Sequence, residues 1–120
     1  MANPSTTGPS GIGSEVLRRV QFNGINNTTT VILTVGTDMI ITVLMINICD
    51  VGGAGGTIDL IVSPDGSGSN YLGNDLSLPA GGTFVWNDKF VLQGTDILKV
   101  ETGGSANVDV WISYIDQDWT

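Results

Sequence analysis

The sequence predicts an all-β protein with a single domain, a jelly-roll-like sandwich of two sheets and about eight antiparallel strands. Three observations lead to this prediction. Runs rich in Val, Ile and Thr recur about every 8–12 residues, as they do in β-sandwiches. The joints between these runs are rich in Gly, Asn and Asp, which favour turns. No segment repeats its apolar residues with the period of a helix, and 120 residues is the usual length of one domain.

The N-terminal half contains four predicted strands after an extended arm. Residues 1–14 hold several Pro and Gly residues, so we expect the arm there and the sandwich domain in residues 15–120. The strands are predicted at 16–22, 29–35, 40–49 and 57–63. The third run is apolar at nearly every position, which indicates a central strand with both faces covered. The fourth alternates, with Ile58, Leu60 and Val62 on one face.

The C-terminal half contains the other four strands, at 71–78, 83–92, 95–102 and 107–115. Gly73 and Asn74 weaken the first of these runs, and Asn87 and Asp88 interrupt the second. The alternation and the apolar run at 40–49 predict a core that includes Leu44, Ile46, Ile48, Leu60, Val62, Val110 and Ile112.

Charge and composition argue against several functions. Twelve acidic residues against four basic ones give a formal net charge of −8, whereas nucleic-acid binding needs Lys and Arg against the phosphates. The longest apolar run, residues 39–46, is far shorter than the roughly 20 residues of a membrane-spanning helix. With no His and a single Cys, Cys49, the chain can build neither a Cys/His zinc site nor a Ser-His-Asp triad. We expect no enzyme, no metal or cofactor, no nucleic acid and no membrane contact, and we interpret Cys49 as a small buried hydrophobe.

Four of the five residues 52–56 are glycine, as in loops that hold nucleotide phosphates. Gly53 and Gly55 match the first two glycines of a dinucleotide fingerprint, but Ile58 stands at the third position. No Lys follows as in a P-loop, and the next segment is a strand rather than a helix. The run therefore predicts a hairpin connection between two strands and no nucleotide site.

Acidic residues form two weaker patterns. Residues 65–75 are rich in side-chain oxygens, but Asn70 and Leu76 stand where an EF-hand calcium loop needs Gly and Glu, so a solvated loop fits better. The pairs Asp88/Asp96 and Asp116/Asp118 have the chemistry to act as acid and base on a glycoside. Nothing in the sequence brings either pair into a cleft.

The aromatic residues offer either a platform for stacking sugars or contacts with a partner. Alternation within 107–115 puts Trp111 on one face with Asp109 and Ser113, and Tyr114 on the core face. We expect Trp111 to be covered by a neighbour or exposed for binding, and Trp119, at the chain end, to dock on a partner. The arm has too few apolar side chains to fold on itself. The candidate subunit or partner contacts are Pro9, Ile12, Trp111, Asp116, Asp118 and Trp119.

Several structural stretches carry a family resemblance. The most telling are Leu-Pro-Ala-Gly at 78–81, Val-Leu-x-Gly-x-Asp-x-Leu-Lys-Val at 91–100 and Ser-Tyr-Ile at 113–115. Over roughly residues 15–119 the chain resembles small virion structural proteins of tailed phages, particularly those of marine cyanobacteria. The resemblance implies a one-domain β-sandwich that is assembled into the virion in the host cytoplasm, against the major capsid protein or other virion proteins.

Within this resemblance, a capsid decoration (cement) protein is the expected function, because the chain is small and carries an arm. A homo-oligomer, with a trimer favoured, would suit the low surface charge. The alternative is a binding module of the neck, tail or fibre that recognises host-surface carbohydrate. An exposed aromatic side chain with convergent polar groups would favour that alternative, whereas no nucleophile and base can be named for a hydrolase.

Overall fold

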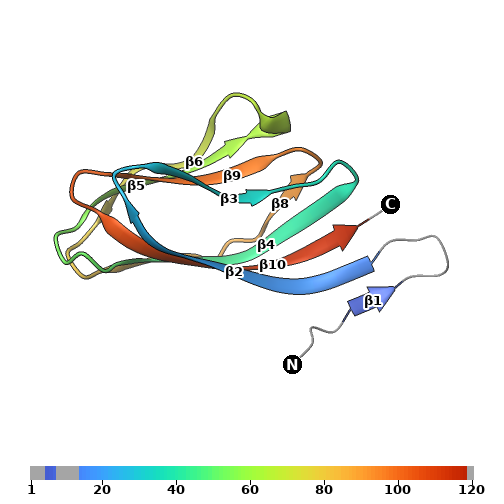
Figure 1. Ribbon diagram of the computed structural model, residues 1–120, viewed down its shortest axis with the longest axis horizontal. Helices are drawn as coiled ribbons and strands as arrows, with labels where there is room; N and C mark the ends of the chain where they lie inside the picture. The colour runs from blue at the N-terminus through green and yellow to red at the C-terminus, as the bar shows by residue number, and fades with distance from the viewer. Residues whose placement is uncertain (1–4, 8–13, 119–120) are drawn as a thin grey trace.

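The computed structural model describes residues 5–7 and 14–118, which fold into a β-sandwich (Figure 1). Besides one short 3-10 turn, η1 (Pro64–Gly66), the elements described are all strands. They are β1 (Ser5–Thr7), β2 (Ser14–Asn26), β3 (Thr29–Thr34), β4 (Met39–Asp50), β5 (Gly56–Ser63), β6 (Asn70–Leu78), β7 (Thr83–Trp86), β8 (Phe90–Gln93), β9 (Ile97–Gly103) and β10 (Asn107–Asp118).

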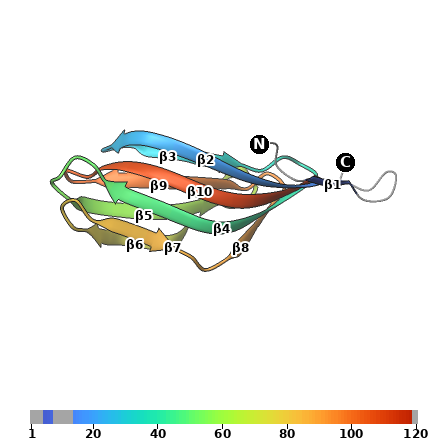
Figure 2. The same ribbon diagram turned by 90° about the horizontal axis from the view of Figure 1, so that it is seen from below.

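The strands form two antiparallel sheets that pack face to face (Figures 1 and 2). Sheet A has the order β1-β2-β10-β4-β7, and β8 also pairs with β4. Sheet B has the order β3-β9-β5-β6. Apart from the pairs β1/β2, β5/β6 and β7/β8, each strand is followed by a strand of the other sheet, so the chain crosses repeatedly between the two layers of an all-β sandwich. The predicted fold class is confirmed.

Two strands differ from the expected series. The break at Asn87 and Asp88 divides the predicted strand 83–92 into β7 and β8, which pair with different halves of β4. At the break, the indole Nε1 of Trp86 donates a hydrogen bond to the Asp88 carbonyl (2.8 Å). The Trp86 ring also packs edge to face against the Phe90 ring, with 6.2 Å between the ring centroids. Within the expected arm, β1 pairs with residues 14–16 of β2, while residues 1–4 and 8–13 lie outside the described residues.

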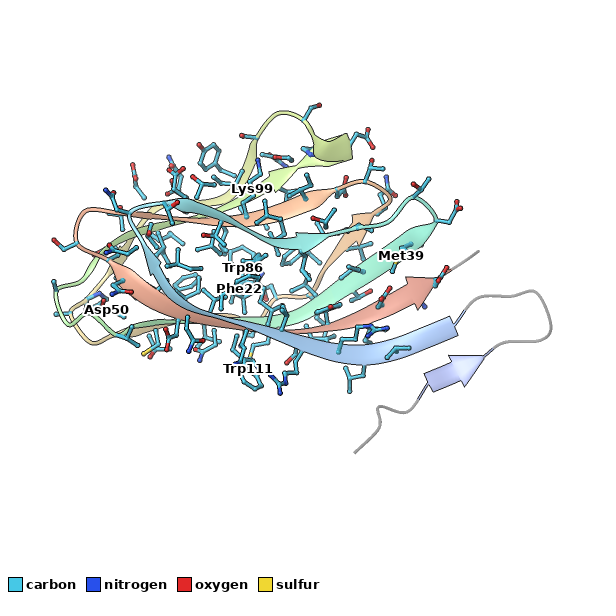
Figure 3. All side chains as sticks on the ribbon, in the orientation of Figure 1. Phe22, Met39, Asp50, Trp86, Lys99 and Trp111 are labelled. Atoms are coloured by element: carbon cyan, nitrogen blue, oxygen red, sulfur yellow. The ribbon has the colours of Figure 1, made fainter. Side chains whose placement is uncertain are left out.

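A single apolar core fills the space between the two sheets (Figure 3). The alternating strands of both sheets turn every second side chain inward, where β-branched residues pack closely. Six of the seven predicted core residues are buried. The side chains with no exposed surface include Val43, Ile46, Ile48, Leu60, Leu98, Val100, Val108 and Ile112.

Leu44 is the exception, because it is only half-buried. Along β4 and β10, Ser113 pairs with Met45, but the next residue, Tyr114, pairs with Val43. Leu44 is therefore the extra residue of a β-bulge, and alternation does not carry across it. The prediction that Leu44 belongs to the buried core is wrong for this reason.

The glycine run at 52–56 connects strands, but it is not a hairpin. β4 belongs to sheet A and β5 to sheet B, so the chain crosses from one sheet to the other here. Gly53 (φ 82°) and Gly55 (φ 71°) adopt the left-handed conformation that favours glycine. A Cβ atom on Gly55 would stand 2.7 Å from the Leu78 carbonyl oxygen, so the crossing also requires a residue without a side chain. The hairpin prediction is wrong because it considered only local sequence.

The carboxylate of Asp50 joins this crossing to the neighbouring turn. The side chain is buried, and its Oδ2 accepts hydrogen bonds from the Gly81 N–H (2.8 Å) and the Gly55 N–H (3.0 Å). The hydrogen bond from Gly81 is the largest influence on the pKa of Asp50, and it lowers that pKa below 3.8. Burial opposes this change, and the N–H groups of Gly55, Asn107 and Gly52 add to it.

Replacing Asp50 by Asn should destabilise the fold, because the amide oxygen that takes the place of Oδ2 is uncharged, and the hydrogen bonds from the Gly81 and Gly55 N–H groups are weaker to a neutral acceptor than to a carboxylate. The lowered pKa fixes the pH dependence of this loss. The charged carboxylate stabilises the fold fully above the unfolded pKa of about 3.8, and this contribution disappears as the pH falls through the lower folded pKa. In urea denaturation, the difference in the free energy of unfolding between wild type and D50N should therefore be constant near neutral pH. This difference should become smaller below about pH 3.8. A difference that grows on acidification would contradict this role of Asp50.

Candidate binding surface

The outer face of sheet A carries several exposed large apolar side chains, those of Leu17, Val85, Val91 and Trp111. β4 lies centrally between β10 on one side and β7 and β8 on the other, as its apolar sequence predicts. However, only its inner face is covered. The outward side chains of Ile40, Met45 and Cys49 are half-buried, and no second layer lies on them within the described residues. The described residues therefore cover only one of the two faces that the sequence predicts to be covered.

A row of side chains crosses the outer face of sheet A at the end where β2 begins and β10 ends. Leu17 of β2 lies opposite Ile115 of β10, Ile115 lies opposite Thr42 of β4, and Thr42 lies opposite Val91 of β8. Leu17 is 45% exposed and Val91 is 61% exposed. We call these four residues the apolar row. It contains no charged side chain.

A groove lies on the same face, beside Trp111 near the middle of β10. Trp111 is 40% exposed and points away from the interior of the sandwich (Figure 3). It lies directly opposite Gln21 of β2 and Asn47 of β4. The groove has a volume of about 300 Å³, at the lower end of the range for small-molecule sites. Its lining includes Gln21, Asn23, Asn47, Cys49, Asp109 and Trp111.

A β-bulge shapes the polar end of this groove. The register of β2 against β10 shifts between Val108 and Val110, so that Asn23 and Gly24 together stand opposite Asp109. Gly24 has the left-handed φ of 69°, and its N–H donates a hydrogen bond to the Asp109 Oδ1 (3.0 Å). The carboxylate is thereby held in one orientation at the groove.

The side chain of Arg19 holds the aromatic wall of the groove. Its guanidinium carbon lies 4.6 Å from the centre of the Trp111 ring, a cation–π contact. One of its terminal nitrogens also donates a hydrogen bond to the Gln21 Oε1 (3.1 Å). The indole and the amide are thus positioned together. Cys49, at the border of the groove, is half-buried rather than buried as predicted.

The other aromatic residues do not join Trp111 in a common platform. Trp86 and Phe22 point into the interior (Figure 3). Tyr71 is exposed, but it belongs to β6 of sheet B. Tyr114 packs against the core on the inner face, as alternation predicts, although it is only partly buried.

Of the candidate contacts near the chain ends, the structure describes only Asp116 and Asp118. Asp116 forms an ion pair with Arg18 of the same chain, with 3.2 Å between Nε and Oδ2, and its side chain is only 13% exposed. Asp118 ends β10, in register with Met39 of β4. Three further candidates, Pro9, Ile12 and Trp119, lie outside the described residues.

The acidic side chains are engaged mainly in turns. The carboxylate of Asp96 accepts hydrogen bonds from the N–H groups of Asp65 and Gln93, and Asp65 accepts one from the Thr95 hydroxyl. Residues 5–7 and 14–118 contain no group of three or more His, Cys, Asp or Glu side chains placed to hold a metal ion. Within that same part of the chain, no helix has the length and apolarity to cross a bilayer.

Comparison with known proteins gives likeness in fold. No protein-family model matches the sequence, and no curated protein matches it significantly. Solved structures similar to it include the following three. A chain of the Bacillus endospore appendages, described as disulfide-linked pili, has a TM-score of 0.51 and 12% identity over 95% of this chain and 96% of that one.

The other two are viral. A chain from the acid-stable capsid of Helicobacter pylori bacteriophage KHP30 has a TM-score of 0.50 and 15% identity, over 86% of each chain. A chain from infectious bursal disease virus has a TM-score of 0.52 and 12% identity over 88% of this chain, which spans only 32% of that one. At these identities the shared property is the fold, a β-sandwich found in capsid and pilus proteins.

The polar residues of the groove could not be found from the sequence. The exposure of Trp111 follows from alternation within one strand. Gln21 and Asn47 meet it only because β2 and β4 flank β10 in sheet A. The one available signal was the interruption of apolar runs by amide side chains at Gln21, Asn23 and Asn47.

Proposed function

We propose that this chain is a structural protein of a bacteriophage virion and that it coats the head as a capsid decoration protein. The observation that carries the proposal is the apolar row on sheet A, which no other described part of the chain covers. The fold, shared with capsid and pilus proteins, supports it.

The apolar row has the character of a protein interface. Exposed apolar surface that is continuous across several strands indicates a site of association. Interface cores are also depleted in charged residues, and the row joins four strands without one. We place the major capsid protein, or another virion protein, on this face. A symmetric oligomer of the chain, with a trimer favoured, is part of the proposal.

The chain ends extend the proposed contact. β1 and the end of β10 lie at the same end of the sandwich as the apolar row (Figure 1). A depression of about 420 Å³ opens beside the end of β10, lined by residues 37–40, Gln93 and Gly94. Its size suits a large side chain from a neighbouring subunit, such as Trp119 of another copy. Pro9, Ile12, Asp116 and Asp118 remain proposed contacts.

The test is attachment of the purified chain to virions assembled without it. We expect wild type to bind to saturation and V91D to bind at least about tenfold more weakly, because a charge would be buried without a partner. L17D should behave like V91D. V31D is the matched control, because Val31 is 47% exposed on a strand of sheet B and its charge would stay in water. Circular dichroism should show that all three variants are folded.

Terminal variants in the same assay examine the proposed contacts of the chain ends. Deletion of residues 1–14, and separately W119A, should each leave a β-rich subunit that attaches weakly or is lost from the particle. If V91D and L17D attach like wild type while V31D does not, the docking face is on sheet B. If wild type does not bind to the virions, the decoration proposal is wrong.

Recognition of host-surface carbohydrate by a neck, tail or fibre module is the second candidate function. The observation that favours it is the groove of amide side chains beside the exposed Trp111.

A further inference from the structure

We infer that the Trp111 groove is a carbohydrate-binding site that takes one or two units of a neutral sugar. The site does not depend on where the chain sits in a virion, and it is separate from the apolar row. It is formed by β2, β4 and β10 of a single subunit, so one copy contains all of it.

The side chains of the groove match the two surfaces of a sugar ring. A pyranose has a face of C–H groups that packs on an aromatic ring, and the indole of Trp111 is 40% exposed. Arg19 lies over one face of this ring, so the sugar would stack on the opposite face. Its hydroxyl groups both donate and accept hydrogen bonds. The amides of Gln21, Asn23 and Asn47 also do both, and the carboxylate of Asp109 accepts. A volume of about 300 Å³ accommodates a ligand of this size.

The charge of the site selects among ligands that stack on aromatic rings. The chain has a net charge of −8 and Asp109 lies at the polar end of the groove, so the phosphate of a nucleotide or the carboxylate of an acidic sugar would meet repulsion there. The positive charge of Arg19, at the other side of the groove, is already engaged by the indole of Trp111 and by Gln21. A purely apolar ligand would leave the amide groups and the carboxylate without hydrogen bonds. A neutral, hydroxyl-rich ligand avoids both costs.

The groove is largely arranged before any ligand arrives. The sheet fixes the relative positions of Gln21, Trp111 and Asn47, which lie directly opposite one another on adjacent strands. Arg19 stacks on the indole and hydrogen-bonds to Gln21, and the Gly24 N–H orients Asp109. Such preorganisation lowers the entropy lost on binding. The groove is open and shallow, so a single site should bind weakly, with a Kd on the order of 1 mM, and an array of copies would gain avidity.

The experiment is NMR titration of the full ¹⁵N-labelled chain with galactose, glucose, mannose, N-acetylglucosamine and their β-linked disaccharides, each to about 10 mM, where a ligand of Kd about 1 mM nearly saturates. The indole N–H signals of the three tryptophans are resolved probes, assigned with W111F and W86F. We expect at least one neutral sugar to shift the Trp111 signal and leave that of Trp86, whose Nε1 is bonded to the Asp88 carbonyl. N-acetylneuraminic acid, which is anionic, should bind more weakly than the best neutral sugar.

Variants locate the site. W111A should weaken binding at least about tenfold, and Q21A and N47A several-fold each, with unchanged circular dichroism. Y71A is the matched control, because Tyr71 is also an exposed aromatic residue, 49% against 40% for Trp111, but lies on the other sheet. The inference is overturned if no sugar shifts the Trp111 signal, or if Y71A abolishes binding and W111A does not. Loss of virion attachment in W111A without any sugar response would also overturn it and assign the groove to the protein interface.

Discussion

Replacing Leu60 by Ala should lower the free energy of unfolding by about 2–5 kcal/mol, the usual range for a fully buried Leu. Leu60 has no exposed surface and lies in β5, in the middle of sheet B. Loss of its side chain leaves a cavity where neighbouring β-branched side chains have little freedom to fill it. Urea denaturation followed by circular dichroism measures the change, provided that the slope m is the same in both proteins.

The matched control is L44A, the same change at the bulge of β4. Leu44 is half-buried, so its truncation should cost less than about 2 kcal/mol. Comparing L60A with L44A distinguishes two strand registers. In the observed register Leu44 is at a bulge, whereas simple alternation placed it in the core. Equal losses for the two variants would mean that the bulge is misplaced.

Replacing Gly55 by Ala should also destabilise strongly, by about 2–5 kcal/mol. The left-handed conformation, with φ 71°, accounts for about 1–2 kcal/mol when the residue has a side chain. The new Cβ would stand 2.7 Å from the Leu78 carbonyl oxygen and 2.9 Å from the Ala80 nitrogen, and overpacking of this kind adds about 1–3 kcal/mol. The same denaturation assay measures the sum.

Gly53 provides the comparison within the same crossing. Its φ of 82° is left-handed as well, but nothing lies within 4 Å of where a Cβ would be. G53A should therefore lose only about 1–2 kcal/mol. If G53A and G55A lose the same amount, the close approach of residues 78–80 to the crossing is not as the structure shows it.

The sequence predicted the structural features that depend on the residue pattern of a single strand. The opposite faces of Trp111 and Tyr114, the burial of Leu60 and Val62, and the central place of β4 all follow from the residue pattern of a single run. Each of these properties depends on the two-residue period of a strand, which is local. Most strand starts were likewise close to those observed, because Gly, Asn and Asp mark the turns. The ends of β2 and β10 lie three to four residues beyond the predicted ones, at Asn26 and Asp118.

The features that the sequence did not predict depend on contacts between segments far apart in the chain. The bulges at Leu44 and Gly24 exist only in relation to β10, so no single run reveals them. The step from β4 to β5 looks like a hairpin locally, but those strands belong to different sheets. Asp50 joins two turns, and its partner Gly81 is set beside it by the pairing of β4 with β7. The meeting of Gln21, Asn47 and Trp111 has the same non-local origin.

The position of β10 has a consequence for how the chain is made. β10 lies between β2 and β4, although β2 ends at Asn26 and β10 begins at Asn107. The pairing of β2 with β10 and of β10 with β4 therefore cannot form until β10 has left the ribosome. Folding of the sandwich follows the synthesis of nearly all of the described sequence. Pairing between such distant segments is slow, on the order of milliseconds to seconds. During that interval β2 and β4 each present an unpaired edge beside apolar side chains, which makes the nascent subunit prone to pair with other copies before it folds.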